Sequence, residues 1–257
     1  MTLRLCSNLD SASDVTSPQV GTGGAEIGTP TYVPCKLGNG IFSNVNDEGC
    51  TFPTGANNIN VARGTIECWI KPSFTPLAAG SHYIWSFLEL VAPFFSSGIT
   101  FIFNGAIDNF QIGAYHNGVR QACANATDFS WNIGDLIHLA ATWDRTGILG
   151  SSKTLIITIN NIERGSTTDI WEDDNTVDPD LYVGIDTKEW SHSDAVIDNL
   201  KAYDTCKIDF SDRLVRCSSY RGISAPPINL LCEQTKNPTN VGDPKPEFSA
   251  IHRVKEV

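Results

Sequence analysis

Oxygen-bearing side chains gather in residues 184–198, which read GIDTKEWSHSDAVID. The carboxylates in this segment are Asp186, Asp194 and Asp198. Calcium is a hard cation that takes several carboxylate, amide and backbone oxygens as ligands, so these three residues predict a calcium site. The competing interpretation is structural, with Asp198 serving the fold rather than a metal.

One aromatic side chain stands in the same polar segment. Trp190 has a flat apolar ring that could stack on the face of a sugar, and His192 follows two positions later. We therefore predict that Trp190 and His192 contact carbohydrate. In the alternative interpretation, Trp190 covers the edge of the hydrophobic core and binds no ligand.

The sequence shows no motif that would support glycoside hydrolysis. Glycoside hydrolases flank the scissile bond with two carboxylates, which retaining enzymes hold about 5–5.5 Å apart. A Glu-x-Asp-x-x-Glu strand would supply such a pair, and the sequence contains none. The densest acidic run, DIWEDDN at 169–175, is typical of a solvated turn, and His138 is interpreted as a structural histidine. No catalytic residue is predicted, and we do not expect an enzyme.

The charge balance argues against one class of partner. The 257 residues include 18 Lys and Arg against 29 Asp and Glu, which gives a formal net charge of −11 at pH 7. Such a surface repels phosphate backbones and anionic lipid headgroups. We expect no nucleic-acid partner.

Membrane insertion is not predicted either. The most apolar window, residues 83–103, is interrupted by Glu89, Pro93 and Gly98, and favours two buried strands around a turn over a spanning helix. The first 15 residues lack an apolar stretch of the length that a secretory signal needs. We expect neither a membrane span nor a signal peptide.

Eight cysteines are spread thinly along the chain, at positions 6, 35, 50, 68, 123, 206, 217 and 232. They include no CxxC pair and no zinc-like spacing. Cys68 shares one face of the segment TIECWIK with Ile66 and Ile70, which favours a buried thiol. A disulfide between Cys206 and Cys217 is left open, and composition does not decide the redox compartment.

Residues 31–213 alternate apolar and polar side chains in short runs. In IHLAATW (137–143), Leu139, Ala141 and Trp143 share one face, and TLIITIN (154–160) alternates in the same way. Period-two patterns between Gly, Asn and Asp turns are typical of antiparallel sandwiches and barrels. We predict an all-β, two-sheet antiparallel β-sandwich, with one short helix over residues 207–218.

Four motifs follow one another in this region. They are GTIECWIKPSF (64–74), DLIHLAATWDRT (135–146), LIITINN (155–161), and LYVGID (181–186) with AVIDNLKAYDTCKIDFSDR (195–213). In this order they resemble the laminin-G-like jelly-roll domains of the concanavalin A-like lectin/glucanase superfamily. The sequence departs from the family pattern at Asn161, where a turn Gly is usual, and at Asn199, where Glu is commoner.

The resemblance covers roughly residues 35–215 and implies a jelly roll. Some laminin-G-like domains bind calcium at the rim, so the resemblance also agrees with the predicted metal site. The fold hosts lectins, adhesion modules, glucanases, lyases and viral surface proteins, and it therefore implies no single function.

The segments on either side of the predicted sandwich lack periodicity. Residues 1–30 are rich in Ser, Thr and Gly, and residues 214–257 carry five prolines. We predict two extended arms, N-terminal over 1–30 and C-terminal over 214–257. Arms of this kind suit an assembly, because main-chain pairing with a neighbouring subunit adds affinity without a deep pocket.

These features predict a non-catalytic binding or structural protein. The first hypothesis is a bacteriophage virion surface component, such as a capsid decoration, fibre or receptor-binding subunit. Its partners would be other subunits, held through the arms, and cell-surface glycans. The alternative is an extracellular carbohydrate-binding or adhesion lectin module, and a glycan-degrading enzyme ranks last.

Overall fold

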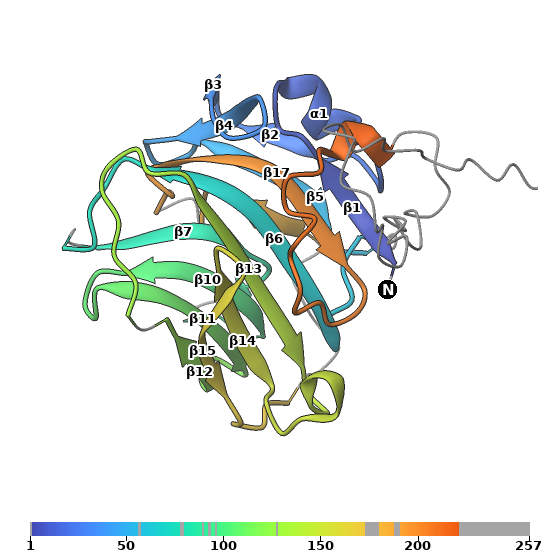
Figure 1. The fold of residues 1–257 in the computed structure, drawn as a ribbon, viewed down its shortest axis with the longest axis vertical. Coiled ribbons are helices and arrows are strands. Elements are labelled where there is room, and N and C mark those ends of the chain that lie inside the picture. The colour runs from blue at the N-terminus through green and yellow to red at the C-terminus, as the bar shows by residue number, and fades with distance from the viewer. Residues whose placement is uncertain are drawn as a thin grey trace, which may run out of the picture.

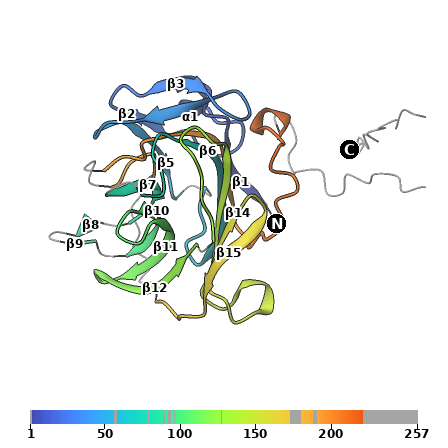
Figure 2. The same ribbon diagram turned by 60° about the vertical axis from the view of Figure 1, so that its left-hand side comes forward.

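The computed structural model describes residues 2–55, 58–77, 80–88, 90–91, 94–95, 97–126, 128–172, 180–187 and 191–220. Two antiparallel sheets lie face to face in this part of the chain (Figures 1 and 2). Besides the strands it contains the short helix α1 (Ala12–Thr16) and the 3-10 helices η1 (Ile148–Gly150) and η2 (Cys217–Tyr220). The predicted β-sandwich is confirmed. No described helix has the length and apolar character needed to cross a membrane.

The first sheet has eight strands in the order β15-β14-β13-β6-β17-β4-β3, with β1 also paired to β17. Its strands are β1 (Leu3–Ser7), β3 (Thr31–Pro34), β4 (Asn39–Ser43), β6 (Arg63–Pro72), β13 (Ile137–Asp144), β14 (Leu155–Ile159), β15 (Ile162–Thr167) and β17 (Ala195–Tyr203).

The second sheet has seven strands in the order β12-β11-β10-β7-β16-β5-β2. Its strands are β2 (Ala25–Ile27), β5 (Gly49–Pro53), β7 (Ser81–Ser86), β10 (Gly98–Asn104), β11 (Asn109–His116), β12 (Val119–Asn125) and β16 (Asp180–Val183). A separate pair, β8 (Leu90–Val91) and β9 (Phe94–Phe95), lies between β7 and β10 in the chain.

The core lies between the two sheets, where every second side chain of each strand points. Trp143 of β13 and Trp85 of β7 are both fully buried and meet across the sandwich with ring centroids 6.1 Å apart. Cys68 of β6 is buried among the same side chains, which confirms the prediction made from its strand face. The Trp143 indole Nε1 also donates to the Val61 carbonyl at 3.0 Å, so its polar atom is satisfied.

The strand β17 changes its neighbour along one edge. Its first residues pair with β4, as in Ile197 with Ile41, and its last residues pair with β1, as in Leu200 with Ser7. Between them Asn199 has a φ of 54°, a left-handed conformation that asparagine tolerates better than most residues, and the register to β6 shifts there. This bulge lets one strand hold two partners end to end.

The N-terminal segment is built into the sandwich. The sequence predicts an extended arm over residues 1–30, whereas the structure places β1, α1 and β2 in this range. Leu5 and Val15 are fully buried in the main core. β1 pairs with β17 and β2 pairs with β5, because those strands offer free edge positions, which composition alone does not reveal.

A disulfide joins this segment to the other end of the described chain. Cys6 of β1 is bonded to Cys217 of η2, 211 residues later. The Cys206–Cys217 pair that the sequence left open is therefore wrong. Cys206 is a free thiol whose Sγ–H contacts the Trp143 carbonyl at 3.5 Å.

Residues 204–220, which we call the C-terminal strap, follow β17 and cross the outer face of the eight-stranded sheet. They contain turns and η2 in place of the helix predicted over 207–218. The rest of the predicted C-terminal arm, from residue 221 onward, lies outside the described residues.

Candidate functional site

The three predicted calcium ligands lie in different surroundings. Asp186 is buried near Tyr83 of the seven-stranded sheet, and Asp194 accepts the Ser73 N–H through its backbone carbonyl. Asp198 lies on the outer face of the eight-stranded sheet, where its Oδ2 accepts the Leu37 N–H at 2.7 Å. Among the described residues, no three His, Cys, Asp or Glu side chains are grouped to hold a metal ion. The structure does not bring these three carboxylates together.

The predicted sugar contacts are described only in part. Trp190 lies outside the described residues. His192 is half-buried, and its Nδ1 lies 2.9 Å from the Asn46 Oδ1, while its backbone bridges to Ile185. The role of both residues in binding carbohydrate stays a prediction.

A second candidate emerges on the outer face of the seven-stranded sheet. Register places Tyr182 of β16 beside Ser86 of β7, Ser86 beside Thr100 of β10, and Thr100 beside Gly113 of β11. A parallel row starts at Tyr83 and crosses through Ile102 to Gln111 and Asn125. Those residues are paired in turn across β7, β10, β11 and β12. Because flanking residues such as Leu181, Phe101 and Ile112 are fully buried in the core, these rows point outward.

Tyrosine rings dominate this face. Tyr83, Tyr115 and Tyr182 are all half-buried, and we call the surface they define with Gln111 and Arg120 the tyrosine face. A Cβ on Gly113 would lie only 3.0 Å from the Tyr115 Cε2, so the glycine leaves room for that ring against the sheet. Burial, helped by Asp186 and Tyr115, raises the pKa of Tyr83 to about 12, and burial also raises the pKa of Tyr115. Both hydroxyls therefore stay protonated and can donate hydrogen bonds.

Two buried hydroxyls beneath this face have no hydrogen-bond partner among the described residues. The Oγ of Ser86 and the Oγ1 of Thr100 are inaccessible and unbonded, although their residues are direct neighbours across β7 and β10. A buried polar group without a partner costs about 1–3 kcal/mol. A polar ligand that reaches these hydroxyls between the tyrosine rings would provide the missing hydrogen bonds.

Alternation in the sequence does not predict this face, because a β-bulge changes which side chains of β7 point outward. Strict alternation puts Tyr83 and Trp85 on the same side of their strand. In the structure the register shifts between them, so that Tyr83 faces outward while Ile84 and Trp85 are both fully buried. The three tyrosines are also 32 and 67 positions apart in the chain, and only strand order brings them together.

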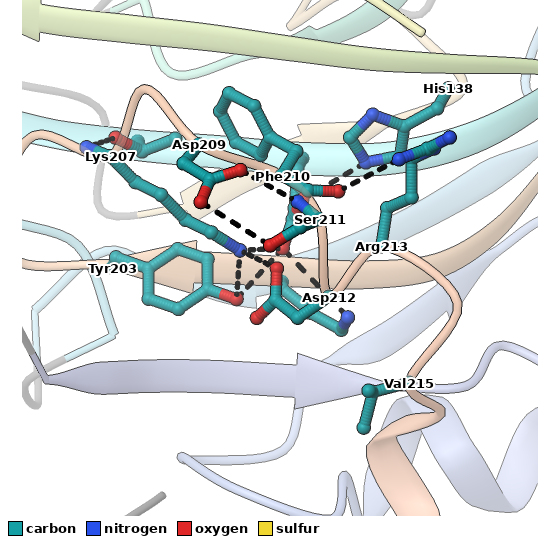
Figure 3. A network of polar contacts seen from close by, with 12 residues as sticks. His138, Tyr203, Lys207, Asp209, Phe210, Ser211, Asp212, Arg213 and Val215 are labelled. Carbon is teal, nitrogen blue, oxygen red and sulfur yellow. Dashed lines mark hydrogen bonds and ion pairs between the residues drawn. The ribbon is translucent and has the colours of Figure 1, made fainter. Parts of the chain in front are cut away.

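The outer face of the eight-stranded sheet is polar too, but the C-terminal strap covers it (Figure 3). At its centre Glu67 of β6 is almost fully buried. Its Oε1 accepts hydrogen bonds from the Tyr203 hydroxyl at 2.7 Å and the Lys207 Nζ at 2.8 Å. Its Oε2 lies 2.9 Å from the His138 Nε2, which confirms His138 as a structural histidine.

The charges in this network balance one another. Burial favours the neutral form of Glu67, but the His138 hydrogen bond and the Lys201 and Lys207 ammonium groups outweigh it and hold the pKa of Glu67 below its ordinary value. Burial lowers the pKa of Lys201 and of His138. Lys207 also reaches the Asp212 Oδ1 at 2.7 Å within the strap, and its contact with Glu67 of β6 fixes the strap to the sheet.

Two hollows are lined by other residues. One, of about 350 Å³, is lined by residues that include Arg4 and Asp204, which form an ion pair at 2.8 Å. The other, of about 320 Å³, lies beside η1 and is lined largely by Ile148, Leu149, Ile156 and Ile208. Neither combines aromatic rings with hydrogen-bonding side chains as the tyrosine face does.

A two-sheet jelly roll with an aromatic and polar outer face defines a lectin-like sandwich. The family model described as the concanavalin A-like lectin/glucanases superfamily matches residues 44–207. The chain therefore belongs to this superfamily. A search of curated proteins finds no match.

Solved structures share the fold. Domain 4 of AbnA, a GH43 extracellular arabinanase from Geobacillus stearothermophilus solved with arabinotriose, matches with a TM-score of 0.59 and 18% identity over 86% of this chain and 98% of that domain. The receptor-binding domain of botulinum neurotoxin C/D mosaic serotype matches with a TM-score of 0.58 and 12% identity over 83% of this chain. This chain corresponds to only 50% of that second structure. At these identities the likeness is one of fold alone.

Proposed function

We propose that this protein is a non-catalytic carbohydrate-binding module that holds a saccharide on its tyrosine face. The observation that carries the proposal is the outward row of Tyr182, Ser86 and Thr100, flanked by Tyr83 and Tyr115. Tyrosine rings offer a flat apolar surface at little cost in conformational entropy. Hydroxyl and amide groups beside them can pair with the hydroxyls of a sugar.

The electrostatics of this face favour binding over hydrolysis. Glycosidases need two carboxylates near the scissile bond, one of them with a raised pKa. The described residues in the two rows are two tyrosines, residues with hydroxyl or amide side chains, an isoleucine and a glycine, and no pair of carboxylates lies in those rows. The domain of AbnA that shares this fold was solved with arabinotriose, and we extend saccharide binding to this chain as part of the proposal.

The disulfide bears on where such a module works. Disulfides persist in oxidising surroundings, so the Cys6–Cys217 bond favours an extracellular location or a virion surface over a reducing cytosol. The virion hypothesis rests largely on the two predicted arms. Residues 2–30 bind their own sandwich in the described structure, which leaves that hypothesis to the segment from residue 221 onward.

Binding of soluble oligosaccharides, measured by a glycan array followed by titration calorimetry, tests the proposal. We expect Tyr182→Ala and Tyr83→Ala each to weaken binding about tenfold or more, because stacking on an aromatic ring is lost. Tyr32→Ala is the matched control, since Tyr32 lies on β3 at the edge of the other sheet. Unchanged affinity in both test variants, or equal loss in the control, would overturn the proposal.

A further inference from the structure

One cation stands on the tyrosine face of this acidic protein. Arg120 of β12 is exposed and pairs with Tyr115 of β11 after a bulge in the register. The bulge turns Arg120 to the same side as Tyr115, above Gly113, where the Arg120 Cδ lies 3.5 Å from the position of a Cβ on that glycine. The stem of the arginine thus lies along the sheet beside the ring.

Neighbouring amides hold the guanidinium in place. Arg120 Nη1 donates to the Gln111 Oε1 at 3.0 Å. Gln111 is itself almost fully buried, and its Nε2 donates to the Asn125 Oδ1 at 2.7 Å. A buried amide that is itself held by Asn125 gives the guanidinium a fixed acceptor, which reduces the entropy that a ligand must remove on binding.

The guanidinium has no carboxylate partner in the described part of the chain. None of the ion pairs found there includes Arg120. Glu172, beyond the end of β12, lies 3.5 Å from the His116 Nε2 instead. In a chain with 29 acidic and 18 basic residues, a held cation without an acidic neighbour leaves its remaining donors available for a bidentate anion.

We propose that the tyrosine face takes a carboxylated saccharide and that Arg120 binds the carboxylate. This inference rests on the proposed function. The sugar ring lies against the tyrosines, and hydroxyls of the ligand approach the buried Ser86 and Thr100 groups. Asp186 lies near Tyr83 at the other side of the face, so among the described charges Arg120 is the group that attracts a carboxylate and Asp186 repels it.

Two matched pairs of probes test this assignment with the full chain in titration calorimetry. Trigalacturonic acid is compared with α-1,4-galactotriose, and 3′-sialyllactose with lactose, so that each pair isolates the acidic group and the two pairs separate uronates from sialosides. We expect the acidic member of at least one pair to bind about tenfold more tightly, and the preference to shrink as salt is added.

Arg120→Gln should remove that preference while neutral sugars still bind. Arg63→Gln is the control, because Arg63 is an exposed arginine at the start of β6 in the other sheet. Equal binding of acidic and neutral members, or a preference that survives in Arg120→Gln, overturns the inference and leaves saccharide binding standing. Absence of binding by all four probes in the unmodified protein, together with no binding on a glycan array, overturns both.

Discussion

The two outer faces of the sandwich differ in how their buried hydroxyls are paired. On the eight-stranded sheet, Thr142 donates to the Lys207 carbonyl of the C-terminal strap, and Glu67 accepts from the Lys207 ammonium. On the seven-stranded sheet, the Ser86 and Thr100 hydroxyls are buried without a partner among the described residues. The strap already bonds the hydroxyl of Thr142, whereas an external ligand could supply hydrogen bonds to Ser86 and Thr100.

The largest effect in this comparison should come from Glu67→Gln. The substitution removes a buried negative charge that contacts both Lys201 and Lys207 beneath the strap. Losing one partner of a buried ion pair costs about 3–5 kcal/mol, which we expect as lost free energy of unfolding in urea. Glu163→Gln breaks the exposed pair with Lys153 and should cost less than about 1 kcal/mol. Similar losses in both variants would mean that the network does not hold the strap.

Asp198, on the outer face of the eight-stranded sheet, should make the stability of the fold depend on pH. Burial raises the pKa of this carboxyl to about 7, although the Leu37 N–H opposes the shift. A carboxyl with a higher pKa in the folded chain takes up a proton on folding, so stability falls as pH rises from about 4 to about 7. Asp198→Asn should remove this dependence and gain about 1–2 kcal/mol at pH 8.

Melting temperatures of Asp198→Asn and the unmodified protein, measured between pH 4.5 and 8.5, check the sign. The advantage of the variant should grow with pH. An advantage that stays constant or shrinks would show that Asp198 is ionised throughout the range in the folded chain.

The smallest expected effects come from two buried threonines, one on the outer face of each sheet. Thr142 donates to the Lys207 carbonyl at 2.7 Å, whereas Thr100 has no partner. Thr142→Val should cost about 1 kcal/mol, and Thr100→Val should be neutral or stabilising by a similar amount. Denaturant unfolding of the free protein measures both. Equal destabilisation would indicate that Thr100 is satisfied in solution, for example by bound water.

Much of the sandwich follows from local patterns. The segments around Cys68 and Trp143 alternate so regularly that their strands, their faces and the family resemblance could be predicted from sequence. The pairing of strands at the edges of the sheets could not be predicted in this way. β1 is a short strand whose partner, β17, lies almost 200 residues later, and no local pattern predicts that pairing. The Cys6–Cys217 bond depends on the same long-range contact.

The candidate site was missed for a related reason. The sequence favours residues 184–198 because their acidic and aromatic side chains are close in the chain. The tyrosine face instead joins three strands through pairing that a single bulge at Ile84 reverses. Arg120 also reaches this face only through a register shift beside Tyr115. Bulges change the side on which a residue lies without changing the composition of its strand.

The disulfide between Cys6 and Cys217 has a mechanical consequence. The two cysteines are 211 residues apart, and nearly every described strand lies between them in the chain. Tension applied to the segments outside this bond passes directly from one sulfur to the other, and the strands within the loop carry none of it. The sandwich therefore keeps its length under load. A load carried along the chain from one side of the bond to the other should therefore leave the strands of the tyrosine face in place.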